Sequence, residues 1–172
     1  MEEKESKKSR TRVFIGSVIS FSDRNLQKIQ HPQEDALVLT LGIGKYDVKR
    51  VLVDPRSSVE VMYMEYFKKL GLKEADLQPA SCPIVGFNGV LVWLVGVVSL
   101  PVTAGSVTEM INFLVITVAS PYNVIMGRTW IHKMKATPST YYQIIKFPTA
   151  NRVKEIWGDQ VEAKKCYSVA IL

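Results

Sequence analysis

Cysteine and histidine are scarce in this sequence, and their scarcity excludes the common zinc modules. The chain of 172 residues has two cysteines, Cys82 and Cys166, and two histidines, His31 and His132. These residues are far apart, with no Cys-x-x-Cys pair and no Cys/His cluster of the kind that binds zinc. We therefore expect no metal site, two free thiols, and histidines that serve as surface or packing residues.

Long hydrophobic runs are also missing. The longest apolar stretch, residues 90–100, is too short to span a bilayer and is followed at once by Pro101. The first twelve residues, MEEKESKKSRTR, lack the apolar centre of a signal peptide. The sequence therefore predicts a soluble, cytoplasmic protein that makes no membrane contact.

The charge is positive, but the excess lies near the chain ends. The net charge is +6, from 22 Lys and Arg against 16 Asp and Glu. The terminal cations are Lys4, Lys7, Lys8, Arg10, Arg12, Lys164 and Lys165. Basic tails are usually solvated, and without adjacent aromatic residues they are weak support for nucleic-acid binding. We expect residues 1–17 to be a charged flexible tail and the domain itself not to bind nucleic acid.

Valine and isoleucine are plentiful and lie in short alternating segments, a pattern typical of strands. Strands are predicted at 13–20, 36–41, 46–53, 123–127 and 141–147, with several more between 84 and 118. Short helices are predicted at 22–30, 62–70 and 129–135. Turn signals lie at 42–45, 86–89 and 104–106. The sequence therefore predicts an all-β protein with a few short helices.

The first motif is an apolar strand that ends on an acid. Val53 leads directly into Asp54, and the loop that follows reads Pro55, Arg56, Ser57 and Ser58. An aspartate at the end of an apolar strand is held rigidly with little water, which suits acid/base chemistry. Taken alone, Asp-Pro is also an ordinary turn.

Two further motifs follow along the chain. Gly86, Phe87, Asn88 and Gly89 separate two apolar segments, so they form either a mobile lid over a cleft or a plain hairpin turn. Ile125, Met126 and Gly127 then precede a short helix. The glycine permits close packing against a neighbouring strand, although a simple strand-to-helix junction is the alternative.

In this order, the three motifs resemble those of retropepsins, the aspartic proteases of retroviruses and LTR retrotransposons. In particular, the chain resembles the protease region of plant gypsy-class elements. Segments similar to YDVKRVLVDPRSS, FKKLGL, VGFNG, SLPVTAG, YNVIMGR and STYYQIIKFPT occur there in the same order. The resemblance covers roughly residues 18–170. It implies a protease domain at 18–148, followed by a linker or extension at 149–172.

The resemblance implies a retropepsin-like acid-protease β-barrel with one catalytic aspartate per chain, Asp54. Residues 55–58 match the active-site loop, residues 86–89 the substrate-binding flap, and residues 125–127 the strand that supports the loop. A complete site would need a homodimer, in which two aspartates share a proton and activate water. The substrate would be a peptide or polyprotein, and no metal or cofactor would be needed.

The active-site loop departs from the family pattern at two positions. Pro55 and Arg56 replace the hydroxyl residue and the glycine of the Asp-Thr/Ser-Gly signature. Pro55 has neither a hydroxyl nor an N–H, and an inward Arg56 would pair with Asp54 and keep both aspartates ionised. The chain is therefore either an active endopeptidase domain of a retrotransposon polyprotein or an inactive remnant that only dimerises or binds peptide. A nucleic-acid module, based on the net charge, is a third and weaker hypothesis.

Overall fold

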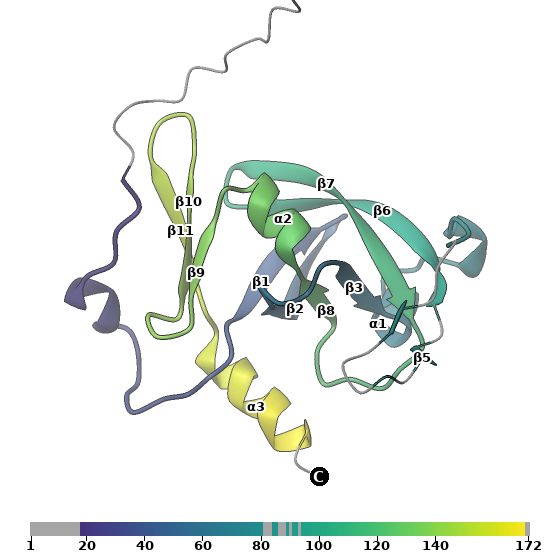
Figure 1. The fold of residues 1–172 in the computed structure, drawn as a ribbon, viewed down its shortest axis with the longest axis horizontal. Helices are drawn as coiled ribbons and strands as arrows, with labels where there is room; N and C mark the ends of the chain where they lie inside the picture. Colours follow the sequence, from purple (N-terminus) through teal and green to yellow (C-terminus); the bar gives the residue numbers. More distant parts are fainter. Residues whose placement is uncertain (1–17, 81–83, 86–88, 90, 93, 171–172) are drawn as a thin grey trace, which may run out of the picture.

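The computed structural model describes residues 18–80, 84–85, 89, 91–92 and 94–170, which fold around a closed six-stranded barrel (Figure 1). Its strands are β1 (Val38–Ile43), β2 (Tyr46–Val53), β3 (Glu60–Tyr63), β6 (Leu94–Ala104), β7 (Val107–Ile116) and β8 (Val124–Met126). They are hydrogen-bonded in the order β1-β2-β8-β3-β7-β6. The predicted fold class, mainly β with short helices, is confirmed.

Two hairpins form where the sequence predicts them. β1 and β2 are joined by Gly44 and Lys45, and β6 and β7 are joined by a turn at Gly105. Gly44 and Gly105 have φ of 61° and 60°, a left-handed conformation that glycine adopts without steric cost. The first turn is shorter than predicted, because Gly42 and Ile43 pair with both β2 and β6.

The hydrophobic core contains large apolar side chains that are fully buried. Met62, Phe67, Phe113, Met126 and Trp130 all have relative exposures of 0 %. Burying one such side chain contributes roughly 1.5–3 kcal/mol, so these residues dominate the stability of the barrel. Two of them come from the short helices α1 (Met64–Lys69) and α2 (Arg128–Lys133), which pack against the strands.

The predicted helix at 62–70 begins later than expected. Residues 60–63 form β3, which lies between β7 and β8 and pairs with both. Val61 and Met62 are buried in this strand. Sheet pairing on both sides outweighs the local helical pattern, so the prediction was wrong for Met62 and Tyr63.

The segment before β1 has little regular structure. The predicted strand at 13–20 is wrong for residues 18–20, and its other residues lie outside the described part. The predicted helix at 22–30 is a single 3₁₀ turn, η1 (Asp23–Leu26). Lys146 holds this segment, because its Nζ donates to Ser20 O at 2.8 Å and to Asn25 Oδ1 at 3.3 Å.

The C-terminal part is ordered and lies against the barrel. Strands β9 (Thr137–Ser139), β10 (Ile144–Pro148) and β11 (Val153–Trp157) form a second sheet, and α3 (Gln160–Ala170) contacts β1 and β2 (Figure 1). β11 and α3 were not predicted. Residues after Pro148 therefore take the form of a folded extension, while the functional limits at 18–148 and 149–172 stay predictions.

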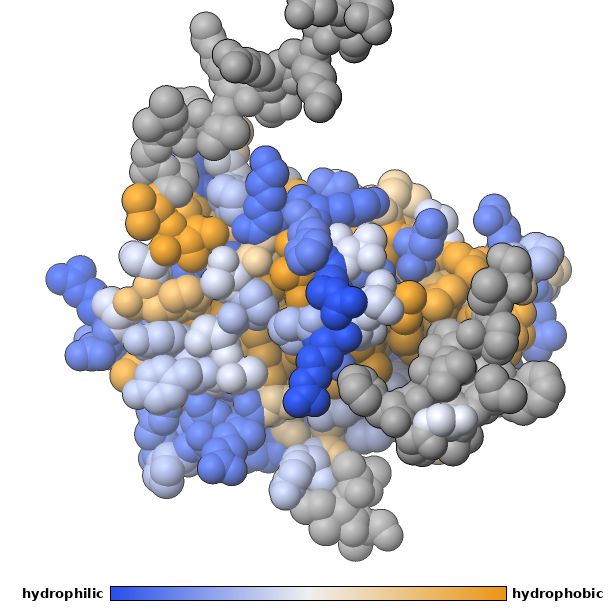
Figure 2. Space-filling view, in the orientation of Figure 1, coloured by the Kyte–Doolittle hydropathy of each residue, from blue (hydrophilic) through white to orange (hydrophobic). Residues whose placement is uncertain are grey.

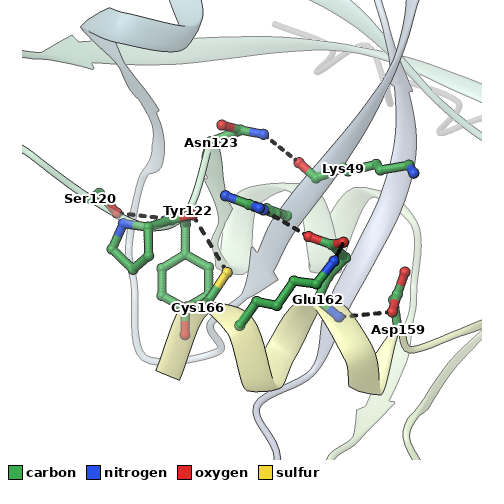
Figure 3. Close-up of polar contacts among 10 residues, drawn as sticks. Lys49, Ser120, Tyr122, Asn123, Asp159, Glu162 and Cys166 are labelled. Atoms are coloured by element: carbon green, nitrogen blue, oxygen red, sulfur yellow. Dashed lines mark hydrogen bonds and ion pairs between the residues drawn. The ribbon is translucent and has the colours of Figure 1, made fainter. Parts of the chain in front are cut away.

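Helix α3 braces the strands that lead to Asp54 (Figure 3). Glu162 Oε2 accepts a hydrogen bond from Arg50 Nε of β2 at 2.7 Å. Cys166 is a free, buried thiol whose Sγ donates to Pro121 O at 3.5 Å, just before β8. Burial raises the pKa of Cys166, so the thiol stays protonated. The other cysteine, Cys82, lies outside the described residues.

Among the helices of the described residues, none has the length and apolar composition required to cross a bilayer.

Candidate active site

Asp54 leaves the barrel where two parallel strands end together. β2 and β8 run parallel, with Val53 opposite Met126, and the Asp54 N–H donates to Met126 O at 2.9 Å. On its other side, β8 is antiparallel to β3. The strands therefore bring together two predicted elements, the acid at Asp54 and the supporting strand Ile125–Gly127.

The loop after β2 closes in a tight turn around the Asp54 carboxylate. The Ser57 N–H donates to Asp54 O at 3.1 Å, and the Arg56 N–H donates to Asp54 Oδ1 at 2.9 Å. Pro55 occupies the first corner of this β-turn, where its fixed φ is favourable and no N–H is needed. The Asp-Pro turn therefore also positions the Asp54 carboxylate.

Beyond the turn, the hydroxyl of Ser57 ties the loop to the next residues. Ser57 Oγ donates to Val59 O at 2.6 Å. Asp54 and Ser57 are half-buried, whereas Pro55, Arg56 and Ser58 are exposed. Figure 2 shows a band of strongly hydrophilic surface over this part of the molecule, between β2 and β3.

Gly127 lets the loop lie directly against the start of α2. A Cβ at this position would be 2.6 Å from Val59 O and 2.7 Å from Ser57 O, both backbone atoms. The next residue, Arg128, donates its N–H to Ser57 O at 2.9 Å. Only glycine fits this contact without moving the loop. The sequence predicted close packing of Gly127 against a neighbouring strand, and the close contact is with the Asp54 loop instead.

The Arg128 side chain also holds the active-site loop. Its Nη1 donates to Arg56 O at 2.9 Å and to Pro55 O at 3.3 Å. Arg128 was not among the predicted site residues, although it follows Gly127 in the Ile-Met-Gly-Arg motif. Its position in that motif was the available signal.

The buried side chain of Glu60 supports the junction between the Asp54 loop and the start of α2. Glu60 is only 3 % exposed. Its Oε1 accepts a hydrogen bond at 2.8 Å from the backbone N–H of Trp130, in the first turn of α2. A negative charge at this end of a helix is favourable, because the free N–H groups carry partial positive charge. Sequence reasoning missed Glu60, whose only signal was a lone acid within the apolar stretch 59–62.

The side chain of Arg56 does not turn inward to pair with Asp54. Its side chain is exposed, and within the described residues the ion pairs include none between Arg56 and Asp54. The same described residues contain no group of three or more His, Cys, Asp or Glu side chains that could hold a metal ion. The polar surroundings of Asp54 are therefore mainly backbone groups of its own loop.

The predicted flap is described only in part. β4 (Ile84–Val85) and β5 (Leu91–Val92) pair antiparallel, and Gly89 has a φ of 72°. Gly86, Phe87 and Asn88 lie outside the described residues. Before β4, the short η2 (Glu74–Asp76) leads to Gln78, which bridges to Val97 of β6. A hairpin at the predicted place is thus confirmed, and its role as a flap stays a prediction.

No protein-family model and no curated protein matches the sequence. Among solved structures, the retroviral protease-like domain of Ddi1 from Leishmania major matches with a TM-score of 0.58 and 15 % identity, covering 74 % of this chain and 96 % of that domain. The chain has the retropepsin-like fold. EIAV protease, solved with the inhibitor HBY-793, matches with a TM-score of 0.52 and 15 % identity, covering 64 % of this chain and 99 % of that protease.

At this identity the likeness establishes the retropepsin-like fold alone. The predicted acid-protease β-barrel is confirmed. The catalytic role of Asp54 and the origin in a plant gypsy-class element stay predictions.

Proposed function

We propose that this chain is an aspartic endopeptidase of the retropepsin kind, within a retrotransposon polyprotein, in which Asp54 from two copies activates water. The observation that carries the proposal is the position of Asp54 at the end of the parallel strands β2 and β8. Its Oδ1 is oriented by the Arg56 N–H at 2.9 Å. A carboxylate held this way is preorganised for acid/base chemistry.

The chemistry follows from bringing two such carboxylates together. Two carboxylates a few ångströms apart cannot both be ionised, so the pair shares one proton. The charged member removes a proton from water as the water attacks the peptide carbonyl, and the protonated member donates to the carbonyl oxygen. Each chain supplies one Asp54, so the active species is a homodimer.

The rest of the loop supports this role. Gly127 packs against the backbone of this loop and the Arg128 side chain donates to Pro55 O and Arg56 O, which supports the turn in spite of the replacement of the family's hydroxyl residue by Pro55. Arg56 is exposed, and among the described residues Asp54 forms no ion pair with a cation. EIAV protease holds the inhibitor HBY-793, and by likeness we propose that residues 86–89 cover a bound peptide segment.

An inactive remnant that only dimerises or binds peptide is the second candidate. Pro55 and Arg56 favour it, because neither residue can reproduce the hydroxyl contact or the small size of the family's Thr/Ser and Gly. At a two-fold axis, the side chain of Arg56 would be present twice.

The test is cleavage of a broad peptide library from about pH 3 to about pH 7, with and without pepstatin. Wild-type, Asp54→Asn and Arg56→Gly chains are compared, and sedimentation equilibrium gives the oligomeric state of each. We expect pepstatin-sensitive cleavage with an acidic optimum, which Asp54→Asn abolishes.

Two other results would decide against an active enzyme. A folded dimer that cleaves only as Arg56→Gly would assign the wild-type chain to the inactive remnants. If neither the wild-type chain nor Arg56→Gly cleaves any peptide, although both are folded and dimeric, the proposed catalytic role of Asp54 is rejected.

A further inference from the structure

A groove of about 1070 Å³ lies between the N-terminal segment, the end of β11 and helix α3. Among the described residues, none that lines the groove belongs to the Asp54 loop or to the β4–β5 hairpin. The proposed protease reaction involves none of these lining residues, which leaves the groove available for a separate binding function.

Among the charged side chains that line the groove, cations are the majority. Four positively charged side chains face it: Lys28, Arg50, Lys164 and Lys165. One carboxylate, Asp159, also lines it, and its Oδ1 accepts the Glu162 N–H at 3.0 Å. Glu162 bridges Arg50 at 2.7 Å and Lys165 at 3.0 Å. Even with Glu162 counted, cations outnumber carboxylates two to one, so the groove attracts anions.

The wall of the groove is held in place by contacts between distant parts of the chain. Gln160 Oε1 accepts the Gln30 N–H at 3.0 Å, and Gln160 Nε2 donates to Gln30 O at 3.2 Å. The same amide donates to Asp35 Oδ2 at 2.9 Å. These bonds fasten the N-terminal segment to the start of α3, so the groove exists before any ligand arrives.

An aromatic ring lies among these cations. Trp157 is half-buried at the end of β11 and lines the groove, with Lys28 Nζ 5.2 Å from its ring centroid. Proteins that bind single strands combine a positively charged groove with aromatic rings on which bases stack. The sequence does not show this combination, because Lys28, Trp157 and Lys164 are brought together only by the fold.

We propose that this groove binds single-stranded nucleic acid, with one base stacked on Trp157 and phosphates held by Lys28, Lys164 and Lys165. The base would take the place of Lys28 over the indole and free that ammonium group for a phosphate. An acidic peptide would use the lysines but not the ring, so nucleic acid accounts for more of the site. The proposal departs from the expectation that the domain itself does not bind nucleic acid.

Fluorescence anisotropy with a labelled oligothymidylate and the full chain tests the proposal. Three phosphate contacts predict that affinity falls roughly twentyfold between about 50 mM and about 200 mM salt. Lys164→Glu should weaken binding about tenfold at low salt and lower the salt slope by about 0.7. Lys68→Glu, the same charge change on α1, should bind like the wild type.

The ring is tested separately. Trp157→Leu should weaken binding about fivefold or more, since stacking of one base is worth about 1–3 kcal/mol, and Trp157→Phe should recover most of the loss. Urea unfolding of each variant shows whether the fold is kept. The Phe variant separates lost stacking from lost packing.

Two outcomes would overturn the proposal. Wild-type affinity in Lys164→Glu would mean that the basic N-terminal residues bind the strand and the groove does not. Equal competition by polyglutamate, with Trp157→Leu unaffected, would mean that the groove takes an acidic peptide chain.

Discussion

The Asp54 loop and the α3 groove are held together in different ways. The loop is fixed mainly by close backbone packing, since a Cβ on Gly127 would be 2.6 Å from Val59 O, and the Arg128 side chain adds two hydrogen bonds. The groove is fixed by long polar side chains, such as Arg50 and Glu162, that remain partly open to water. The loop should therefore be intolerant of added atoms and insensitive to salt, whereas α3 should tolerate substitution but respond to charge.

The largest effect should come from adding one methyl group at the loop. Gly127→Ala brings a Cβ against two backbone carbonyls that cannot rotate away, so we expect a loss of about 3 kcal/mol of unfolding free energy. Urea denaturation measures it. In the control Gly42→Ala, the nearest atom is Thr103 Cβ at 3.2 Å, and the loss should be under about 1.5 kcal/mol. Equal losses would show that the loop contact is not special.

A smaller effect should follow from removing the buried acceptor below the loop. Glu60→Ala leaves the backbone N–H of Trp130 without its hydrogen-bond acceptor, and we expect the free energy of unfolding to fall by about 2 kcal/mol. Glu60→Gln keeps an acceptor oxygen and should lose less than about 1 kcal/mol. The comparison uses urea unfolding at neutral pH. If Gln were as damaging as Ala, the charge rather than the hydrogen bond would be what α2 requires.

Removing the Arg128 side chain should loosen the loop with little effect on the barrel. Arg128→Met loses the bonds to Arg56 O and Pro55 O, which are partly exposed, so stability should fall by about 1 kcal/mol or less. Hydrogen exchange of the peptide covering residues 54–60 should speed up, while exchange in β6 and β7 stays unchanged. Unchanged exchange in the loop would show that the Arg128 side chain does not hold it.

The smallest effect should be at α3, and it should depend on pH. Hydrogen bonds from Arg50 and Lys165 lower the pKa of Glu162 below its ordinary value of 4.5. Its contribution is therefore complete above the unfolded-state pKa and is lost as pH falls through the lower, folded-state pKa.

The measurement is the midpoint of thermal unfolding as a function of pH. Glu162→Gln should unfold at a lower temperature than the wild type at neutral pH, and the difference should disappear in acid. In the control, Glu65→Gln removes an exposed partner of Lys69 on α1 and should change little at any pH. A difference that persists in acid would show that packing, not charge, holds α3.

Much of the site was predictable because its parts are short and local. An apolar strand ending at Asp54, and a glycine after Met126, can be recognised from a few neighbouring residues. The residues that complete the site could not be found that way. Glu60 acts on Trp130, seventy positions away, and nothing near Glu60 in sequence marks that contact.

The C-terminal part shows the same limit on a larger scale. The segment after Pro148 has no clear periodic pattern, yet β11 pairs with β10 along its length and α3 packs on β1 and β2. Similarly, Met62 and Tyr63 were predicted to be helical but belong to β3, because two neighbouring strands are available for pairing. Local propensity is weak compared with the gain from burying a strand between two others.

By itself, the sequence determined the mainly β class and the hairpin turns, and the retropepsin-like barrel was implied only by the resemblance of its motifs to a known family. These depend on alternation, glycine conformation and side-chain chemistry over a few residues. Only the tertiary structure decided that Glu60 and Arg128 hold the Asp54 loop, and that Lys28, Trp157 and Lys164 face one groove. Such contacts join residues far apart in the chain, and they form only when burial of the barrel core brings those residues together.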